Sequence, residues 1–417
     1  MKALVAPVIA LVLCSNLAPK SDLPNKLAVA PPDKEQSGKK VDERLTAATS
    51  KFAFKLYDQV LKHRTSQNVF ISPTSVLMAL AMAYNGAEGE TGRSMADALQ
   101  LEGMSLEEVN RATADLKSAL DTADPKVQLK IANSLWARNG LPLKPAFIQR
   151  SRDYYSAEVA SLDFASPQAL ATINSWVSRN TQGKIESVID RIEPDTILFL
   201  INAIYFKGQW QISFEKEKTR DDVFRLGGGG QKKLPMMSQS GRFLYHKGKD
   251  FQAIALPYGG GRISMYVFLP DERTTLDQFE RNLTAENWEN WMNSVRLTQG
   301  DLTLPRFKIE YEADLVKTLQ ALGMGEAFNP LRANFSGIAE TNPANKFYIS
   351  KVTHKALAEV NEEGTVAAAV TAAAMTMASA QPPQEPFVMK VDRPFFFAIR
   401  DNSTGVVLFM GSVSDPG

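Results

Sequence analysis

The chain has 417 residues, of which 44% are hydrophobic and 22% charged, and these fractions are typical of a globular protein with a large core. Its 47 basic and 46 acidic residues give a formal net charge of +1, so bulk charge favours neither nucleic acid nor an anionic membrane as a partner. The single cysteine, Cys14, excludes an intramolecular disulfide and a cysteine-based metal or redox cluster.

The first residues are typical of a secretory signal peptide. Met1-Lys2 supplies a positive charge, and the apolar run from Ala3 to Leu13 is too short to span a membrane as a helix. We expect a signal peptide over 1–18 and a disordered tether over 19–42, which is rich in Pro, Lys, Asp and Ser. The protein is therefore expected to be secreted or extracytoplasmic.

Cys14 leaves a second interpretation of this segment open. It stands where a bacterial lipoprotein carries its acylated cysteine, although Leu13 precedes it where Gly, Ala or Ser is usual. Lipid anchoring at Cys14 is thus an alternative to release, whereas cleavage after Ala18 or near Ala30 leaves a mature chain without cysteine.

Apolar periodicity over 43–417 indicates a single α+β domain, helical in its first part and rich in strands later. Helices are expected from Leu45 to His63-Arg64, after Ser72-Pro73 and over Ser105–Leu120. Strands are expected over Val127–Gly140, Ile197–Trp210, Phe251–Leu256, Ile263–Leu269, Leu302–Ile309 and Phe347–Val352, with hairpin turns at Tyr258–Arg262 and Asp401–Gly405. The run from Ile197 is apolar on both faces, which predicts a central strand.

Catalytic and cofactor-binding signatures are missing from the sequence. It contains no G-x-S-x-G, no H-E-x-x-H, and three histidines, His63, His246 and His354, that are far apart along the chain. Gly227–Gly230 lacks the following helix and Lys-Ser/Thr of a phosphate-binding loop, so it is expected to be a hairpin loop. The sequence predicts neither an enzyme nor a metal or cofactor site.

The segment Glu362–Pro383 is unusual because it has no charge between Glu363 and Gln381 and consists mostly of small or β-branched residues. One interpretation is an alanine-rich helix that begins after Gly364 and stops at Pro382-Pro383. The other is a segment that becomes a strand, with small side chains on both faces that fit between two existing strands.

Several stretches together resemble the serpins, from Leu45 to Pro416 and in the sequence order of that family. The matching stretches are NVFISPTSV, INSWVSRNTQGKI, LINAIYFKGQW, LPRFKIEYEADL, FYISKVTHKALAEVNEEGT and VDRPFFFAIRDNSTGVVLFMGSV. The resemblance implies an α+β serpin fold: a large central β-sheet with additional sheets, about eight to nine helices, and an exposed reactive-centre loop over 362–386.

The resemblance also implies roles for individual residues. Ser72, Ser75, Asn202 and His354 match the shutter, a polar cluster beneath the central sheet. Trp210, Arg306 and Glu362 match the breach, the top of that sheet where insertion begins. Without the resemblance, each would be interpreted as ordinary packing or as a surface ion pair worth under about 1 kcal/mol.

The uncharged segment then corresponds to the reactive-centre loop. Its hinge comprises Glu362, Gly364, Thr365, Ala367, Ala368 and Ala369. Counting from the hinge puts the reactive bond at Ala378-Ser379, whereas counting back from Pro394 puts it near Pro383-Gln384. We favour the hinge count because proline is a poor residue before a scissile bond, and Met375 and Met377 remain alternatives.

The resemblance implies suicide inhibition of a serine protease. The partner is then a serine protease held in a covalent acyl complex, and the inhibitor is expected to be a monomer. Ala378 would suit elastase-like or subtilisin-like enzymes, and Met375 or Met377 chymotrypsin-like ones. No Arg or Lys lies between Thr365 and Gln384, which disfavours trypsin-like and thrombin-like targets. The rival interpretations are a non-inhibitory serpin that acts as a binding or storage protein and, more distantly, a hydrolase.

Overall fold

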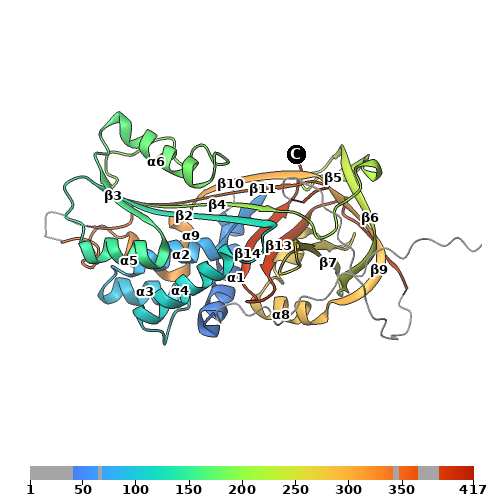
Figure 1. Ribbon diagram of the computed structural model, residues 1–417, viewed down its shortest axis with the longest axis horizontal. Helices are drawn as coiled ribbons and strands as arrows, with labels where there is room; N and C mark the ends of the chain where they lie inside the picture. The colour runs from blue at the N-terminus through green and yellow to red at the C-terminus, as the bar shows by residue number, and fades with distance from the viewer. Residues whose placement is uncertain (1–40, 64–67, 341–346, 365–384) are drawn as a thin grey trace, which may run out of the picture.

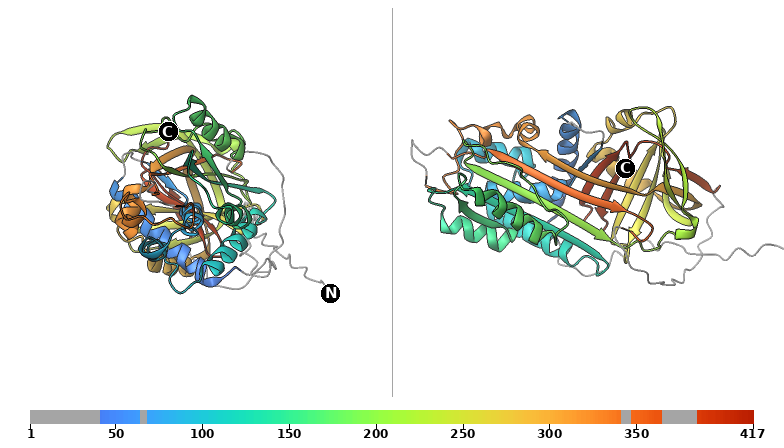
Figure 2. Two further views of the ribbon diagram at one scale, coloured as in Figure 1. Left: turned by 90° about the vertical axis from the view of Figure 1, so that its left-hand side faces the viewer. Right: turned by 90° about the horizontal axis from the view of Figure 1, so that it is seen from above.

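The structure is a computed structural model that describes residues 41–63, 68–340, 347–364 and 385–417. A five-stranded sheet runs along the molecule in the order β10 (Phe307–Asp314), β11 (Lys351–Val360), β4 (Leu198–Gly208), β2 (Val127–Arg138) and β3 (Glu158–Leu162) (Figure 1). Seen from above, β10, β11, β4 and β2 lie side by side (Figure 2). β4 pairs antiparallel with β2 but parallel with β11, so β4 and β11 run in the same direction and their flanking strands β2 and β10 run opposite to them.

Side-chain alternation decides which layer each residue of β4 contacts. Phe199, Ile201 and Ala203 pack beneath helix α6 (Pro167–Asn180), which covers one face of the sheet. Leu200 and Phe206 point into the main core on the other face. Both faces are buried, which confirms the central strand predicted from the apolar run.

The second sheet has nine strands, held together by the long strand β6 (Gln231–Lys247). β6 pairs with β5 near its start, with β9 along its middle and with β7 near its end, so these strands belong to one continuous sheet beside the five-stranded one. The remaining members are β1 (Val69–Ile71), β5 (Arg220–Arg225), β7 (Phe251–Tyr258), β8 (Ile263–Pro270), β9 (Arg296–Pro305), β12 (Phe387–Lys390), β13 (Phe395–Asp401) and β14 (Val407–Val413).

Nine α-helices lie in the described part of the chain. They are α1 (Glu43–His63), α2 (Pro73–Tyr84), α3 (Gly89–Leu99), α4 (Leu106–Asp121), α5 (Pro145–Tyr155), α6, α7 (Leu276–Glu280), α8 (Ala285–Ser294) and α9 (Val316–Leu319). α2 begins where the Ser72-Pro73 signal predicts, because the Ser72 hydroxyl caps the Ser75 N–H and Pro73 needs no intrahelical donor. α2 packs against β4 and β2 on the face opposite α6 (Figure 1).

The predicted α+β organisation is confirmed, and two expected strands need correction. Leu302–Ile309 is not one strand, because the chain changes sheet at Arg306, between Pro305 at the end of β9 and Phe307 at the start of β10. The buried apolar positions change phase at this bend, from Leu302 and Leu304 to Phe307 and Ile309, but the apolar pattern does not show that the two halves pair in different sheets. The strand expected over Phe347–Val352 begins at Lys351 and continues to Val360.

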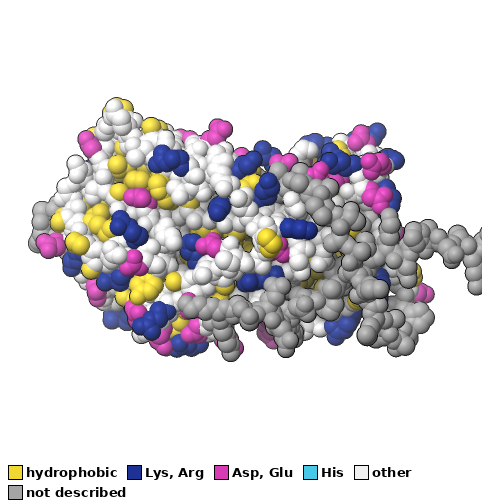
Figure 3. All heavy atoms as spheres, viewed as in Figure 1, with side chains coloured by type: hydrophobic (Ala, Val, Ile, Leu, Met, Phe, Trp, Pro, Cys, Tyr) yellow, Lys and Arg dark blue, Asp and Glu magenta, His cyan; other side chains and the backbone are white. Residues whose placement is uncertain are grey.

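The distribution of surface charge and the lengths of the helices agree with the balanced charge and the globular composition of the sequence. Acidic and basic side chains are interspersed over the face drawn in Figure 3. Within the ranges that the structure describes, no helix is both long and apolar enough to cross a membrane, and no group of three His, Cys, Asp or Glu residues could hold a metal ion.

Candidate functional site

The four residues predicted to form a polar cluster lie within hydrogen-bonding distance of one another. Asn202 of β4 and His354 of β11 are Cα partners across the parallel junction. Asn202 Oδ1 lies 2.6 Å from His354 Nδ1 and accepts from the Ser75 hydroxyl at 2.8 Å. The Ser72 backbone N–H donates to His354 Nε2 at 3.1 Å, so the start of α2 is joined to both strands.

These contacts fix the tautomer of His354. Because Nε2 accepts the Ser72 N–H, the proton of the neutral ring is on Nδ1, which donates to Asn202. His354 is completely buried, and burial lowers its pKa to about 3. The ring is therefore neutral at physiological pH, and the cluster introduces no charge beneath the sheet.

Asn133 of β2 is a further member of the cluster that the sequence interpretation missed. Its Oδ1 accepts from Asn202 Nδ2 at 2.7 Å, and the same Nδ2 donates to the Ser75 carbonyl at 3.1 Å. Asn133 and Asn202 are Cα partners, so three neighbouring strands each contribute one polar side chain. The available signal was a polar residue within an otherwise apolar stretch of strand, which Asn133 shares with Asn202.

A second polar contact lies where β11 ends. Glu362 is 2% exposed, and one of its oxygens accepts from Arg306 at 2.8 and 2.5 Å and from the Thr219 hydroxyl at 2.5 Å. Burial raises the pKa of the Glu362 carboxyl, but the hydrogen bonds from Arg306 and Thr219 outweigh it, so the pKa lies below its ordinary value. Thr219 was not predicted, because nothing local in the sequence links it to Glu362.

Trp210 joins this region to the nine-stranded sheet. Its ring stacks on Tyr258 with centroids 4.3 Å apart, and its Nε1 donates to the carbonyl of Asn361 at 2.9 Å. Its backbone N–H donates to the carbonyl of Glu363 at 3.0 Å. Trp210 thus holds the residues that follow β11 against the end of β4.

Gly364 is the first residue of the uncharged segment and the last one described before residue 385. It forms an isolated bridge with Gln209, just beyond the end of β4, at φ +125°. A Cβ at this position would lie 2.2 Å from the Gly208 carbonyl oxygen, so the close approach requires glycine. The other hinge residues (Thr365, Ala367, Ala368, Ala369), the reactive-bond candidates (Met375, Met377, Ala378, Ser379) and Cys14 lie outside the described residues.

The geometry defines what a strand following Gly364 could do. β4 and β11 run parallel and pair directly from Phe199/Lys351 to Tyr205/Leu357. The chain leaves β11 and reaches Gly364 beside the end of β4, at one end of their junction. An extended segment that turned back from there would run antiparallel to both strands, and antiparallel partners can pair with each of them.

Comparisons with known proteins agree with this architecture. Residues 47–416 match the family described as Serpin (serine protease inhibitor). The chain is 39% identical over 386 residues to the leukocyte elastase inhibitor of Bos taurus, covering 90% of this chain and all of that protein. It is 36% identical to an uncharacterized serpin-like protein of Thermococcus kodakarensis, over 88% of this chain and 85% of the other.

The solved structure of tengpin, a thermophilic serpin in its native state, superimposes with a TM-score of 0.82 at 32% identity, covering 93% of this chain and all of tengpin. This chain therefore belongs to the serpin family of serine protease inhibitors, and the predicted serpin fold is confirmed. It is a protease inhibitor and not an enzyme in the catalytic sense.

Proposed function

We propose that this chain traps serine proteases as a suicide substrate. The protease serine oxygen attacks the carbonyl carbon of Ala378, and the bond to the Ser379 nitrogen breaks as that nitrogen takes up a proton. An ester then joins the protease to the new end of the loop. The loop from Thr365 onward inserts between β4 and β11 before water can hydrolyse the ester, and serpin loop insertion is a recognised case of strand addition with release of stored strain.

One observation carries the proposal. Gly364, the first small residue of the uncharged segment, is bridged to Gln209 beside the end of β4, while β4 and β11 pair directly with no strand between them. Insertion of roughly fourteen residues at about 3.3 Å each moves the attached protease on the order of 45 Å. Because the ester holds the protease to the moving end of the loop, such a displacement leaves the protease distorted before water can hydrolyse the ester.

The hinge residues suit this movement. Thr365, Ala367, Ala368 and Ala369 are small and uncharged, so they fit between closely packed strands. We propose that Glu362, Arg306 and Trp210 form the breach where insertion starts. Further along the same junction, the shutter residues Ser72, Ser75, Asn202 and His354 exchange hydrogen bonds when β4 and β11 separate.

The proposed targets are proteases with small or shallow primary pockets, of the elastase or subtilisin type. Ala378 at the reactive bond supports this choice, and so do the names of the relatives, which are leukocyte elastase inhibitors. Use of Met375 or Met377 instead would direct the inhibitor to chymotrypsin-like enzymes. The covalent partner is in either case a serine protease, with one monomeric inhibitor consumed per enzyme.

We further propose that 1–18 is a signal peptide, 19–42 a tether and 43–417 the serpin domain, so the protein acts outside the cytoplasm. The apolar run after Met1-Lys2 supports this proposal. Mass spectrometry of the protein recovered from its native source tests it. A start after Ala18 or near Ala30 supports secretion, and a lipid on an N-terminal Cys14 supports anchoring. A chain that retains Met1 contradicts both.

The function is tested by incubating the protein with pancreatic elastase, subtilisin, chymotrypsin and trypsin, followed by denaturing gels and mass analysis. We expect a gel-stable covalent complex with at least one of the first three enzymes and a released peptide that begins at Ser379. A peptide beginning at Thr376 or Ala378 identifies Met375 or Met377 instead. Clean cleavage by all four enzymes without complex contradicts inhibition and supports the binding or storage alternative.

A further inference from the structure

A cavity of about 940 Å³ lies between the turn that joins β6 to β7 and the helices α7 and α8. Its volume is within the usual range of sites for small organic ligands, about 300 to 1,000 Å³. None of the residues of the polar cluster beneath the five-stranded sheet, and none of those around Glu362, lines it. The cavity is thus a separate feature that the inhibitory mechanism does not use.

One wall of the cavity is aromatic. The ring centroids of Phe251 and Trp291 are 4.8 Å apart, those of Phe279 and Trp291 are 5.5 Å apart, and those of Phe251 and Phe279 are 5.3 Å apart. Phe251 and Phe279 are buried, so the protein core fixes their positions, whereas Trp291 is half-buried. Trp291 is therefore the ring on which a flat apolar group can stack, and the two buried phenylalanine rings hold it in place.

The cavity also carries an excess of positive charge. Lys249, Arg273 and Arg281 line it, and none of the three has an ion-pair partner among the residues that the structure describes. A fourth cation, Lys247, is neutralised by Asp271 at 2.7 Å. Among the described residues that line the cavity, Asp250 is the one carboxylate, so the charges do not balance.

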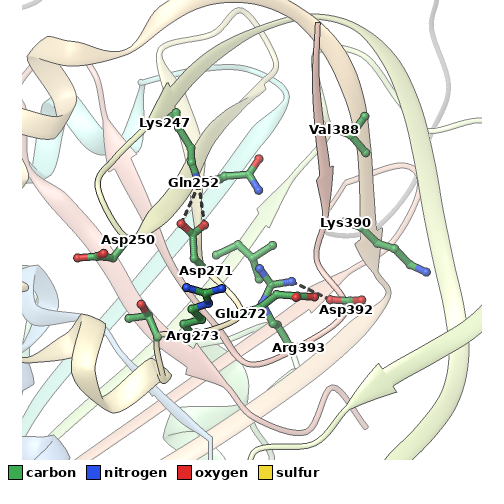
Figure 4. A pocket seen from close by; sticks show the side chains of 12 residues that line it. Lys247, Asp250, Gln252, Asp271, Glu272, Arg273, Val388, Lys390, Asp392 and Arg393 are labelled. Carbon is green, nitrogen blue, oxygen red and sulfur yellow. Dashed lines mark hydrogen bonds and ion pairs between the residues drawn. The ribbon is translucent and has the colours of Figure 1, made fainter.

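A neighbouring cavity of about 550 Å³ shows that this imbalance is local. Figure 4 shows its lining, in which Lys247 faces Asp271 and Arg393 faces Asp392. Lys390 from the same lining pairs with Asp222 at 2.6 Å. Arg273 lines both cavities, but Lys249 and Arg281 line only the larger one, so the larger cavity holds two further cations without an ion-pair partner among the described residues.

We infer that the larger cavity binds a small aromatic anion, such as an aryl carboxylate or aryl sulfonate. Its ring would stack on the wall formed by Phe251, Phe279 and Trp291, and its anionic group would pair with Lys249 and Arg281. A single concave site suits a compact ligand better than an extended polyanion, which needs a row of cations along its length. This inference is independent of the loop and of the proposed protease trapping.

The test uses the intact protein and the fluorescent probe 8-anilinonaphthalene-1-sulfonate. We expect saturable binding with one probe per chain, and at least a tenfold weaker affinity in the double variant Lys249→Gln/Arg281→Gln. Both side chains are exposed, so the variant should keep its melting temperature in the absence of probe. Lys51→Gln/Lys55→Gln removes two exposed cations from α1 and should bind the probe like the unaltered protein.

A second arm uses N-phenyl-1-naphthylamine, which has similar rings and no charge. It should bind at least tenfold more weakly than the sulfonate, and the Lys249→Gln/Arg281→Gln variant should bind it unchanged. Equal affinities of the two compounds, or an unchanged sulfonate affinity in the variant, would overturn the inference. Trp291→Leu should weaken both compounds, and an unaffected Trp291→Leu variant counts against the aromatic wall.

Discussion

Glu362 is a buried carboxylate that hydrogen-bond donors keep charged. It is 2% exposed, and its Oε1 accepts from both nitrogens that Arg306 offers and from Thr219. Removing Arg306 leaves Thr219 as the remaining side-chain donor. We therefore expect Arg306→Ala to lower the free energy of unfolding by about 1–3 kcal/mol, the cost of a buried charged group that loses a partner, measured by urea denaturation.

The matched control is Arg191→Ala, because Arg191 and its partner Glu193 are both exposed. An exposed pair contributes about 0–1 kcal/mol, so the control should change the urea midpoint little. Equal effects of the two substitutions on the urea midpoint would show that burial of the Glu362 carboxylate does not depend on its contact with Arg306. In that case the Glu362–Arg306 contact could not secure the residues that lead into the loop.

His354 makes stability depend on pH in a defined direction. Its pKa is about 3 in the folded chain, against an ordinary value of 6.5 that applies after unfolding. Below pH 6.5 the unfolded chain takes up a proton that the folded chain does not, so stability is complete above 6.5 and declines as the pH falls. The expected slope from this residue is about 1.4 kcal/mol per pH unit.

The variant His354→Asn isolates this contribution. It should be less stable than the unaltered protein at pH 7.5, yet lose less stability between pH 6.5 and 5.0. This window lies above the ordinary pKa values of carboxyl groups. Denaturant titrations at four pH values measure both slopes. Burial lowers the pKa of His246 as well, but that residue is present in both proteins and cancels in the comparison. Parallel slopes contradict a neutral buried His354.

At the scale of elements, the β4–β11 junction is the part of the sheet that the proposed insertion has to open. Ile201 and Thr353 are Cα partners across it. Adjacent strands lie about 4.8 Å apart, a separation that a disulfide can bridge. In a Cys14→Ser background, Ile201→Cys/Thr353→Cys should form a covalent protease complex when reduced, whereas the oxidised protein should be cleaved without forming the complex.

The single variant Ile201→Cys, treated with the same oxidant, should keep forming the complex in both states. Gels with and without reductant give the yields directly. If the oxidised double variant still traps protease as efficiently as the reduced one, the loop does not insert between β4 and β11. The disulfide blocks separation of β4 and β11 but leaves the loop open to cleavage, so the yield of complex reports on insertion alone.

Sequence patterns predicted the elements well where one physical signal was strong. The unbroken apolar run of β4 indicated a strand buried on both faces, and Ser72-Pro73 marked the start of α2. The change of sheet at Arg306 was missed, because hydrophobic alternation records burial and not strand partners. For the same reason Asn133 and Thr219 were missed, since their partners lie far away along the chain.

At the scale of the whole molecule, the five-stranded sheet can accept one more strand. β4 and β11 could each pair with an inserted strand on the side where they now pair with each other. The inserted strand would add on the order of ten net backbone hydrogen bonds, each worth about 1 kcal/mol. Since each kcal/mol raises the melting temperature of a chain of this size by roughly 2 °C, we expect the melting temperature to rise on the order of 20 °C after cleavage of the loop. Differential scanning calorimetry before and after subtilisin treatment measures it.

The control for this prediction places the same charge inside or outside the inserting segment. Thr365→Glu puts a carboxylate in the hinge, where insertion would bury it unpaired, and should abolish the rise. Gln381→Glu lies beyond the proposed reactive bond and should leave the rise intact. An unaltered protein whose melting temperature stays constant after cleavage contradicts the stored strain that the mechanism requires.

The central claim is that the cleaved loop becomes a strand between β4 and β11. A crystal structure of the protein cleaved at Ala378-Ser379 tests this claim most directly, through the spacing of the two strands at Asn202 and His354. Insertion predicts that the spacing increases from about 4.8 Å to about 9.6 Å, with residues from Thr365 onward paired antiparallel to both strands. A cleaved protein in which Asn202 and His354 remain neighbouring Cα partners would contradict the account.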